Sequence, residues 1–261
     1  MKIHFEPKTF LNALRLVKSA VPKANFIPAL QHIKVHASFE DGVILSATDK
    51  EYGIRVRLDV DVFESGCALL PVKEVVDALA MIPKGSKATI ENTDEGVRVA
   101  SDPAEVGWRF ACEESVDKFP DVADFTAEAY HEVGDADMLT AIQRTVFAVE
   151  KDSIREGLSG VCFESDNSTM HAVATDGHRL AIQKFVGKSI GGHSLGLSVD
   201  TVPECQTIVP VKALKLLEKC LKDKVIGKIS HSVKMAVGTV AVKGKEKNRI
   251  ITFQYCLVLN K

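Results

Sequence analysis

Residues 171–182 read HAVATDGHRLAI and place an Asp-Gly pair between two apolar, alternating runs. An Asp-Gly pair in this setting is among the strongest local signals for a β-hairpin, because both residues tolerate a positive φ. We therefore expect antiparallel strands over 170–175 and 178–185, joined at Asp176-Gly177. The polar cluster around this turn is the first candidate for a functional site.

The turn belongs to a set of local repeats that divide the chain into two halves. Three pairs of matches occur in the same order at nearly constant separation: Leu-x-Ala at 11–13 and 139–141, Ala-Thr-Asp at 47–49 and 174–176, and aliphatic-Pro-Val-Lys at 70–73 and 209–212. Each pair falls on the same kind of expected element, so the matches indicate an internal duplication. The last pair is separated more widely, and the Gly- and Ser-rich segment 187–206 is the loop expected to account for the insertion.

Hydrophobic periodicity predicts two helices in each half, together with short alternating strands. The helices are expected over 8–21, 71–82, 136–149 and 210–224. The fold class that follows is α+β, with duplicated domains that each pack two helices on largely antiparallel sheets. The boundary is expected in the Asp-, Pro- and Ala-rich run 117–128, which gives domains over 1–125 and 126–261.

The composition is that of an ordinary globular protein. Of 261 residues, 46% are hydrophobic and 26% are charged, which excludes wholesale disorder and collagen-like structure. The N-terminus has no apolar signal-peptide region and no apolar run is long enough for a membrane helix, so we expect a cytoplasmic location. Six cysteines lie at wide, irregular spacings without a C-x-x-C pair. We therefore expect free cysteines, mostly in the core, and no zinc-ribbon or disulfide framework.

Basic residues concentrate on two of the expected helices, although the formal net charge of the chain is −2. On the helix at 210–224, four lysines fall within one arc, opposite the leucines that face the sheet. The helix at 8–21 has a similar basic side. The residues on these two faces are Lys8, Arg15, Lys18, Lys212, Lys215, Lys219 and Lys222, and Lys23 adds a further positive charge just after the first helix. Sequence-independent contact with nucleic-acid phosphates and simple solvation of a helix surface explain this pattern about equally well.

No catalytic or metal-binding motif stands out. Asp176 and His178 lie on one turn, but a hydrolase triad needs a nucleophile on a G-x-S-x-G elbow, which the chain lacks. The run 187–189 (GKS) lacks the earlier glycine of a phosphate-binding loop, because Ile182 stands at that position, and it is expected to be flexible loop. The eight histidines are scattered and include no H-E-x-x-H pair. We therefore expect a non-catalytic protein without a metal or cofactor.

Several stretches of the chain resemble one family. Residues 174–181 (ATDGHRLA) resemble the signature stretch of the bacterial DNA sliding clamp, the β subunit of DNA polymerase III. Further stretches with this resemblance are IPAL at 27–30, LSATD at 45–49, FPD at 119–121 and IVPVK at 208–212. The resemblance implies the DNA-clamp fold, a homo-oligomeric ring around duplex DNA with helices lining the hole and sheets forming the outer wall. It also implies a non-catalytic processivity factor for DNA replication that tethers the replicative polymerase to DNA.

The resemblance assigns roles to two groups of residues. Those expected to face DNA are Arg15, Lys18, Lys23, Lys151, Arg155, Lys212, Lys215, Lys219 and Lys222. Those expected to bind short peptide tails of partner proteins are Leu158, Thr175, Gly177, His178, Arg179 and Leu180. The implied partners are duplex DNA of any sequence, the α subunit of DNA polymerase III, the clamp loader and other proteins with clamp-binding peptides.

One departure from the family concerns length. Family members have three domains and the resemblance covers the first two, so a third domain is expected to be absent here. The family's rings close between domain one of one subunit and domain three of the next. We therefore expect either a truncated chain or a six-domain ring of three two-domain chains. The alternative function is a truncated, clamp-like interaction module that no longer encircles DNA.

Overall fold

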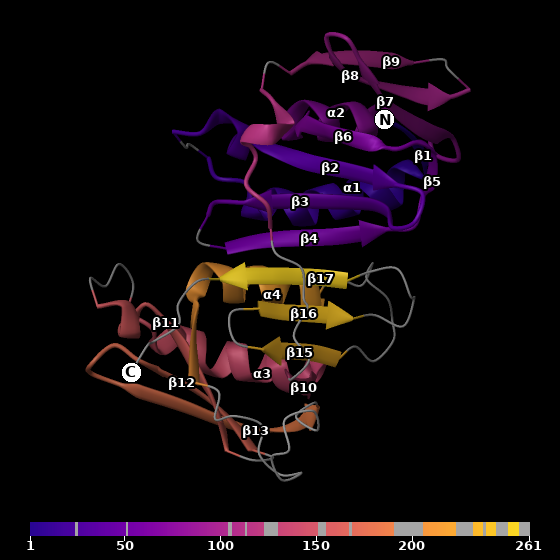
Figure 1. The fold of residues 1–261 in the computed structure, drawn as a ribbon. Coiled ribbons are helices and arrows are strands. Elements are labelled where there is room, and N and C mark those ends of the chain that lie inside the picture. The colour runs from indigo at the N-terminus through magenta and orange to yellow at the C-terminus, as the bar shows by residue number, and fades with distance from the viewer. Residues whose placement is uncertain are drawn as a thin grey trace, which may run out of the picture. The chain divides into compact units, whose positions relative to one another are not determined.

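The computed structural model describes residues 1–23, 26–50, 52–103, 106–112, 114–122, 130–150, 155–166, 169–190, 206–222, 232–236, 239–243 and 250–255. The chain divides into two compact units. Unit 1 comprises residues 1–123 with 247–251, and unit 2 comprises residues 124–246 with 252–261. Figure 1 shows that each unit combines helices with antiparallel strands.

Unit 1 contains two groups of antiparallel strands. One group has the order β5-β1-β7-β8-β9, and in the other β6, β2, β3 and β4 follow one another. The helices are α1 (Pro7–Val17) and α2 (Val72–Met81). The strands are β1 (Lys2–Phe5), β2 (His32–Ser38), β3 (Gly42–Thr48), β4 (Tyr52–Leu58), β5 (Asp61–Glu64), β6 (Gly66–Pro71), β7 (Lys87–Thr93), β8 (Gly96–Asp102) and β9 (Gly107–Ala111).

Unit 2 has the strand order β14-β11-β12-β13-β10-β15-β16. Its helices are α3 (Asp135–Thr145) and α4 (Val211–Lys222). Its strands are β10 (Tyr130–Gly134), β11 (Gly160–Asp166), β12 (Thr169–Thr175), β13 (Leu180–Ile190), β14 (Gln206–Pro210), β15 (Ser232–Ala236) and β16 (Thr239–Lys243), and β17 (Ile250–Tyr255) follows later in the chain.

The two units repeat the same order of elements, which confirms the duplicated α+β fold. In both, a strand leads into a helix, three strands pair in sequence, and a further strand pairs with the first of those three before the second helix begins. Unit 2 uses one long strand where unit 1 uses two. Strand β13 pairs with β12 from Thr175↔Leu180 to Thr169↔Val186 and then with β10, whereas β4 pairs with β3 and the separate β5 pairs with β1.

Within each unit, the helices pack on each other and on the strands through their apolar faces. Helix α1 packs on α2, β3 and β4, and α3 packs on α4, β12 and β13. Pro7 at the first helical position of α1 suits that helix start, because its fixed φ is already helical. The largest side chains buried in this way include Phe10, Leu14, Leu45, Ile54, Phe163 and Leu214. Burial of each such side chain contributes about 1.5–3 kcal/mol, so these faces fix how each helix is rotated.

The structure corrects two expectations about local structure. The first helix ends at Val17 and continues as a 3₁₀ turn over Lys18–Ala20, because Pro22 forces the preceding Val21 into extended backbone. Residues 187–190 are strand rather than flexible loop, because β13 continues onto β10. Gly187 permits this, since a Cβ there would lie 2.6 Å from the Met170 sulfur. Residues 191–205 of the expected loop lie outside the described residues.

The cysteines are also less buried than expected. None of the four described cysteines forms a disulfide bond, and Cys220 is buried. The other three, Cys67, Cys112 and Cys162, are half-buried, so the expectation that most cysteines lie in the core is wrong for them. Cys205 and Cys256 lie outside the described residues.

Candidate functional site

Helix α4 presents a row of lysines to solvent. Leu214 and Leu217 are buried because α4 packs on β14 and α3. The residues on the opposite side are exposed, and they are Lys212, Lys215, Lys219 and Lys222. The basic face expected from the spacing is therefore present, and we refer to these four residues as the α4 lysine face.

One acid lies beside the α4 lysine face. The Glu218 carboxylate accepts a hydrogen bond from the Lys222 ammonium at 2.6 Å and another from the Gln143 amide of α3 at 3.3 Å. The hydrogen bond from Lys222 is the main reason that the pKa of Glu218 lies below its ordinary value, and the charge of Lys215 adds to it. Lys222 is thereby neutralised in part, which leaves Lys215 as a stronger candidate for binding an external anion.

The second basic face lies on α1 and the residues that follow it. Lys8, Arg15, Lys18 and Lys23 are all exposed, whereas Phe10 and Leu14 are buried on the opposite side of α1. Lys18 lies in the 3₁₀ turn and Lys23 lies beyond it, so this face follows the end of the helix rather than one continuous helical stripe. Of the two candidates in the loop before β11, Arg155 is exposed and Lys151 lies outside the described residues.

The turn between β12 and β13 is fixed by its own side chains. The Thr175 hydroxyl donates to the Arg179 carbonyl at 2.8 Å and accepts from the Gly177 N–H at 3.1 Å. The Asp176 carboxylate accepts from the backbone N–H groups of Arg179 at 2.9 Å and His178 at 3.0 Å. These two hydrogen bonds, with that from the Arg179 side chain, lower the pKa of Asp176. Gly177 has a φ of 85°, as the turn requires.

The hairpin expected at Asp176-Gly177 is confirmed, but its loop is longer than expected. Thr175 pairs with Leu180, so four residues form the turn and the second strand begins at Leu180 rather than at His178. The side-chain hydrogen bonds of Thr175 and Asp176 explain the longer loop, because they satisfy backbone groups that a two-residue turn would pair within the ladder. His178 and Arg179 are thereby exposed on the turn.

A groove of about 750 Å³ lies between this turn and helices α3 and α4. Its apolar side includes Ile142, Val146 and Phe147, and its rim carries charges of both signs, including Arg179 and Glu218. The Arg179 guanidinium donates to the Asp176 carboxylate at 2.8 Å and lies 5.7 Å from the centre of the Phe147 ring. This contact holds an exposed aromatic ring and a cation together at the edge of the groove.

The structure brings together some of the six residues expected to bind peptides. His178 and Arg179 line the groove. Thr175 and Gly177 do not line the groove but fix the conformation of the turn, through the Thr175 hydroxyl and the positive φ of Gly177. Leu158 is half-buried at the end of the 3₁₀ turn Glu156–Leu158, and its carbonyl accepts a hydrogen bond from the Glu150 N–H at 3.1 Å. Leu180 is 62% exposed at the start of β13, so it is not an ordinary core residue.

Phe147 and Arg144 are neighbours of the turn that the sequence pattern did not single out. Phe147 is 58% exposed in the 3₁₀ turn Val146–Ala148, and the Arg144 guanidinium donates to the Gln183 side chain on β13 at 3.0 Å. The sequence signal that would have found Phe147 is a large aromatic residue off the apolar face of its helix. A helix expected through 146–149 makes Phe147 an ordinary exposed helix residue, whereas the 3₁₀ turn holds its ring beside the Arg179 guanidinium.

Neither a metal-binding cluster nor a membrane-spanning helix is found in the described part of the chain. Within it, no group of three or more His, Cys, Asp or Glu side chains is arranged to hold a metal ion. Within the same residues, no helix has the length and apolar character needed to cross a membrane.

Family models of one protein match most of the chain. The model of the DNA polymerase III beta subunit N-terminal domain matches residues 1–109, and that of the central domain matches residues 132–255. Among curated relatives, the beta sliding clamp of Proteus mirabilis is 27% identical over 198 residues, which is 75% of this chain and 53% of that protein. The Vibrio cholerae beta sliding clamp is 26% identical over 238 residues, 89% of this chain and 60% of that protein. The chain thus spans little more than half the length of these relatives.

Solved structures share the fold. The DNA polymerase sliding clamp of Bacillus subtilis matches with a TM-score of 0.82 at 22% identity, over 100% of this chain and 66% of that one. The Pseudomonas aeruginosa sliding clamp bound to griselimycin matches with a TM-score of 0.80 at 22% identity, again over 100% and 66%. With both halves matched by consecutive domain models and the duplicated fold shared with solved clamps, the chain belongs to the family of the bacterial DNA polymerase III β subunit, the DNA sliding clamp.

Proposed function

We propose that the chain acts in the cytoplasm as a non-catalytic processivity factor, a sliding clamp that encircles duplex DNA and tethers the replicative polymerase. The observation that carries the proposal is the exposed α4 lysine face, together with the basic face of α1, in a family of DNA clamps and in a chain whose net charge is −2. Cations collected on a helix face of each unit, in a chain that is otherwise acidic, favour DNA contact at those two faces and repulsion elsewhere.

The expected DNA contact is with phosphates rather than bases. Lysine ammonium groups on exposed helix faces bind phosphate as mobile point charges, and neither basic face carries the planar amide pairs that read base edges. Each lysine that neutralises a phosphate adds about 0.9 to the slope of log affinity against log salt. We expect the contribution of each lysine to be this size or smaller, and the same for any DNA sequence. Such weak, uniform contacts suit a protein that must slide.

We propose that partner peptides bind at the turn of unit 2, in the groove and on the neighbouring leucines. The support is chemical. The groove combines an apolar side with the His178 and Arg179 side chains, and Leu180 is exposed directly after the turn. The half-buried Leu158 is hydrogen-bonded through its carbonyl to Glu150, which lines the groove. Short peptides with leucine and aromatic side chains fit such a site. The expected ligands are the tails of the DNA polymerase III α subunit, the clamp loader and other clamp-binding proteins.

Topological retention on DNA tests the proposed function. The protein is loaded on nicked circular DNA by a clamp loader, passed over a sizing column at high salt, and compared with a sample linearised after loading. A clamp stays with the circle and is lost from the linear form, because it slides off the ends. Equal retention on both forms, or none on either, would instead support the module that no longer encircles DNA. Light scattering of the same sample gives the number of chains in the bound species.

A further inference from the structure

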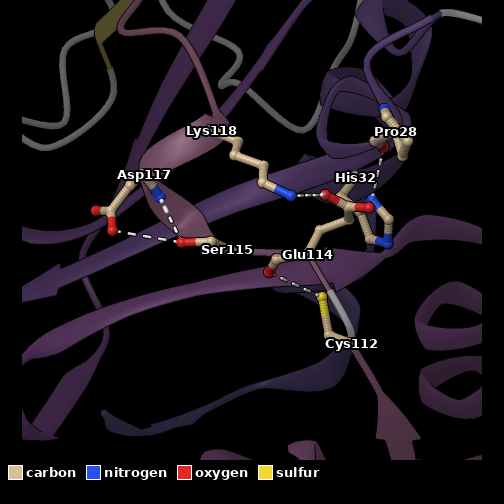
Figure 2. Close-up of polar contacts among 7 residues, drawn as sticks. All are labelled: Pro28, His32, Cys112, Glu114, Ser115, Asp117 and Lys118. Atoms are coloured by element: carbon tan, nitrogen blue, oxygen red, sulfur yellow. Dashed lines mark hydrogen bonds and ion pairs between the residues drawn. The ribbon is translucent and has the colours of Figure 1, made fainter.

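A segment at the end of unit 1 lies against the body of that unit. We call residues 115–122 the strap. Phe119 and Val122 of the strap are buried in a cluster with Ala29, Leu30 and Leu69, and Val116 packs against the same cluster. Figure 2 shows where the strap begins, with Ser115 capping the short turn at Asp117 while Lys118 contacts Glu114. The strap therefore occupies an apolar site on unit 1.

Polar contacts fix the far end of the strap. The Lys34 ammonium lies 3.0 Å from the Asp121 carboxylate and 5.8 Å from the centre of the Phe119 ring. The Arg55 guanidinium donates to the Val122 carbonyl at 3.2 Å. Aromatic and aliphatic anchors, a paired carboxylate and a bound carbonyl are the contacts by which grooves hold extended peptide ligands.

Gly53 leaves space for Val122 of the strap on the surface of unit 1. A Cβ at Gly53 would lie 2.8 Å from a Val122 methyl group, so a side chain at this position would push Val122 away. Gly53 has no positive φ that would otherwise require glycine. The glycine thus serves the close approach of the strap to β4.

The duplication places this surface at the same positions as the proposed peptide site of unit 2. Gly53 pairs with Thr48 as Leu180 pairs with Thr175, and His32 pairs with Pro71 as Gly160 pairs with Pro210. These pairs define equivalent positions in the two units. Leu30 and Leu158 lie two residues before His32 and Gly160, so they correspond, and Leu69 and Ile208 correspond in the same way before Pro71 and Pro210. Gly53 corresponds directly to Leu180. The strap therefore covers in unit 1 the counterparts of the half-buried Leu158 and the exposed Leu180 of unit 2.

We infer that unit 1 carries a second peptide-binding surface, at Leu30, Lys34, Gly53 and Arg55, which the chain's own strap occupies as a built-in ligand. Its ligand class follows from the occupant: an extended segment with an aromatic residue, a proline, an acid and an aliphatic residue in that order, as in Phe119–Val122. The two cations that hold this ligand correspond to Cys162 and Ile182 in unit 2, so the two surfaces select different peptides. The inference goes beyond the proposed function, because it stands on contacts within unit 1.

A labelled peptide with the sequence of residues 115–122 tests the inference. In the wild-type chain the tethered strap competes with the peptide at an effective concentration near the millimolar range. We expect no saturable binding to the wild type and at least about tenfold tighter binding to Phe119→Ala/Val122→Ala. A second variant, Asp121→Lys, repels Lys34 from a position that is 95% exposed and leaves the apolar contacts in place, so it is expected to fold and to bind the peptide, although more weakly than Phe119→Ala/Val122→Ala because its strap keeps the two apolar anchors.

Controls separate this surface from the one in unit 2. Lys34→Glu added to Phe119→Ala/Val122→Ala is expected to abolish binding, whereas Leu158→Ala/Leu180→Ala added to the same background is expected to leave it unchanged. Fluorescence of Trp108, the single tryptophan, reports that unit 1 is folded in each variant. The inference is overturned if folded Asp121→Lys binds no peptide, or if binding survives Lys34→Glu. Loss of binding through the unit 2 leucines would also overturn it, without bearing on DNA retention.

Discussion

The turn at Thr175 is built a second time in unit 1, and the two copies predict opposite effects of exchanging one residue. In the unit 1 copy, the Thr48 hydroxyl donates to the Tyr52 carbonyl at 2.8 Å and accepts from the Lys50 N–H at 3.0 Å, while the Asp49 carboxylate accepts from the Tyr52 N–H at 3.0 Å. The left-handed position holds Lys50, with φ of 79°, where unit 2 has Gly177 with φ of 85°. Unit 1 therefore carries a side chain in a conformation that disfavours one.

The magnitude follows from the backbone alone. A left-handed conformation costs a residue with a Cβ roughly 1–2 kcal/mol, and glycine adds about 0.5–1 kcal/mol of conformational entropy to the unfolded chain. Lys50→Gly is therefore expected to stabilise unit 1 by about 0.5–1 kcal/mol. Gly177→Ala is expected to destabilise unit 2 by about 0.5–1 kcal/mol, because the same two terms act in the opposite direction and a Cβ at 177 meets nothing within 4 Å that would add a clash.

The two units need separate probes. Trp108 lies on β9 of unit 1, so its fluorescence during thermal unfolding reports Lys50→Gly, for which a rise of roughly 2–5 °C is expected. Hydrogen exchange of the β12 and β13 amides reports Gly177→Ala. Lys50→Ala is the matched control, since it shortens the side chain without relieving the backbone. An unchanged or lower midpoint for Lys50→Gly, or stabilisation by Lys50→Ala of the same size, would refute the reasoning.

Three further predictions concern charge and protonation. Glu218→Gln is expected to tighten DNA binding, because Lys222 is no longer neutralised in place; titration at two salt concentrations measures this, and weaker binding would contradict it. Burial lowers the pKa of His131 below its ordinary 6.5, so the unfolded state takes up a proton that the folded state resists. Stability of unit 2 is therefore expected to fall as pH drops below about 6.5, and less so in His131→Leu, as denaturation from pH 7.5 to 5.5 would show. Asp176→Ala is expected to speed hydrogen exchange of the 178 and 179 amides, whereas Asp176→Asn keeps one acceptor and is expected to retain more protection.

The duplication and the helix faces could be predicted from the sequence because they depend on local order. Leucines and lysines at helical spacing fix the two sides of α4 whatever the rest of the chain does. Repeated Ala-Thr-Asp marks the same turn twice because its hydrogen bonds are all within five residues. The four-residue loop could not be predicted, since the Asp-Gly pair also suits a two-residue turn.

The strap and the groove depend on residues that are distant in sequence. Lys34 and Asp121 are 87 residues apart, and Arg55 and Val122 are 67 apart, so no local pattern connects them. The groove needs the 3₁₀ turn that exposes Phe147 and the packing of α3 against α4. The length of β13 is a third case. Its first part pairs with β12 and its last four residues, 187–190, pair with β10, which is distant in sequence. The Gly- and Ser-containing sequence at 187–190 instead suggested a loop.

The salt dependence of DNA binding tests the central claim most directly. The variant Lys212→Gln/Lys215→Gln/Lys219→Gln is compared with Lys87→Gln/Lys118→Gln/Lys184→Gln, which removes the same charge from exposed residues outside the two basic faces. Duplex affinity is measured across a range of salt for two unrelated sequences. The account predicts a slope reduced by up to about 0.9 per lysine for the α4 variant on both sequences, and a slope close to that of the wild type for the control. Equal slopes for the two variants would contradict it and would make the α4 lysine face an ordinary solvated surface.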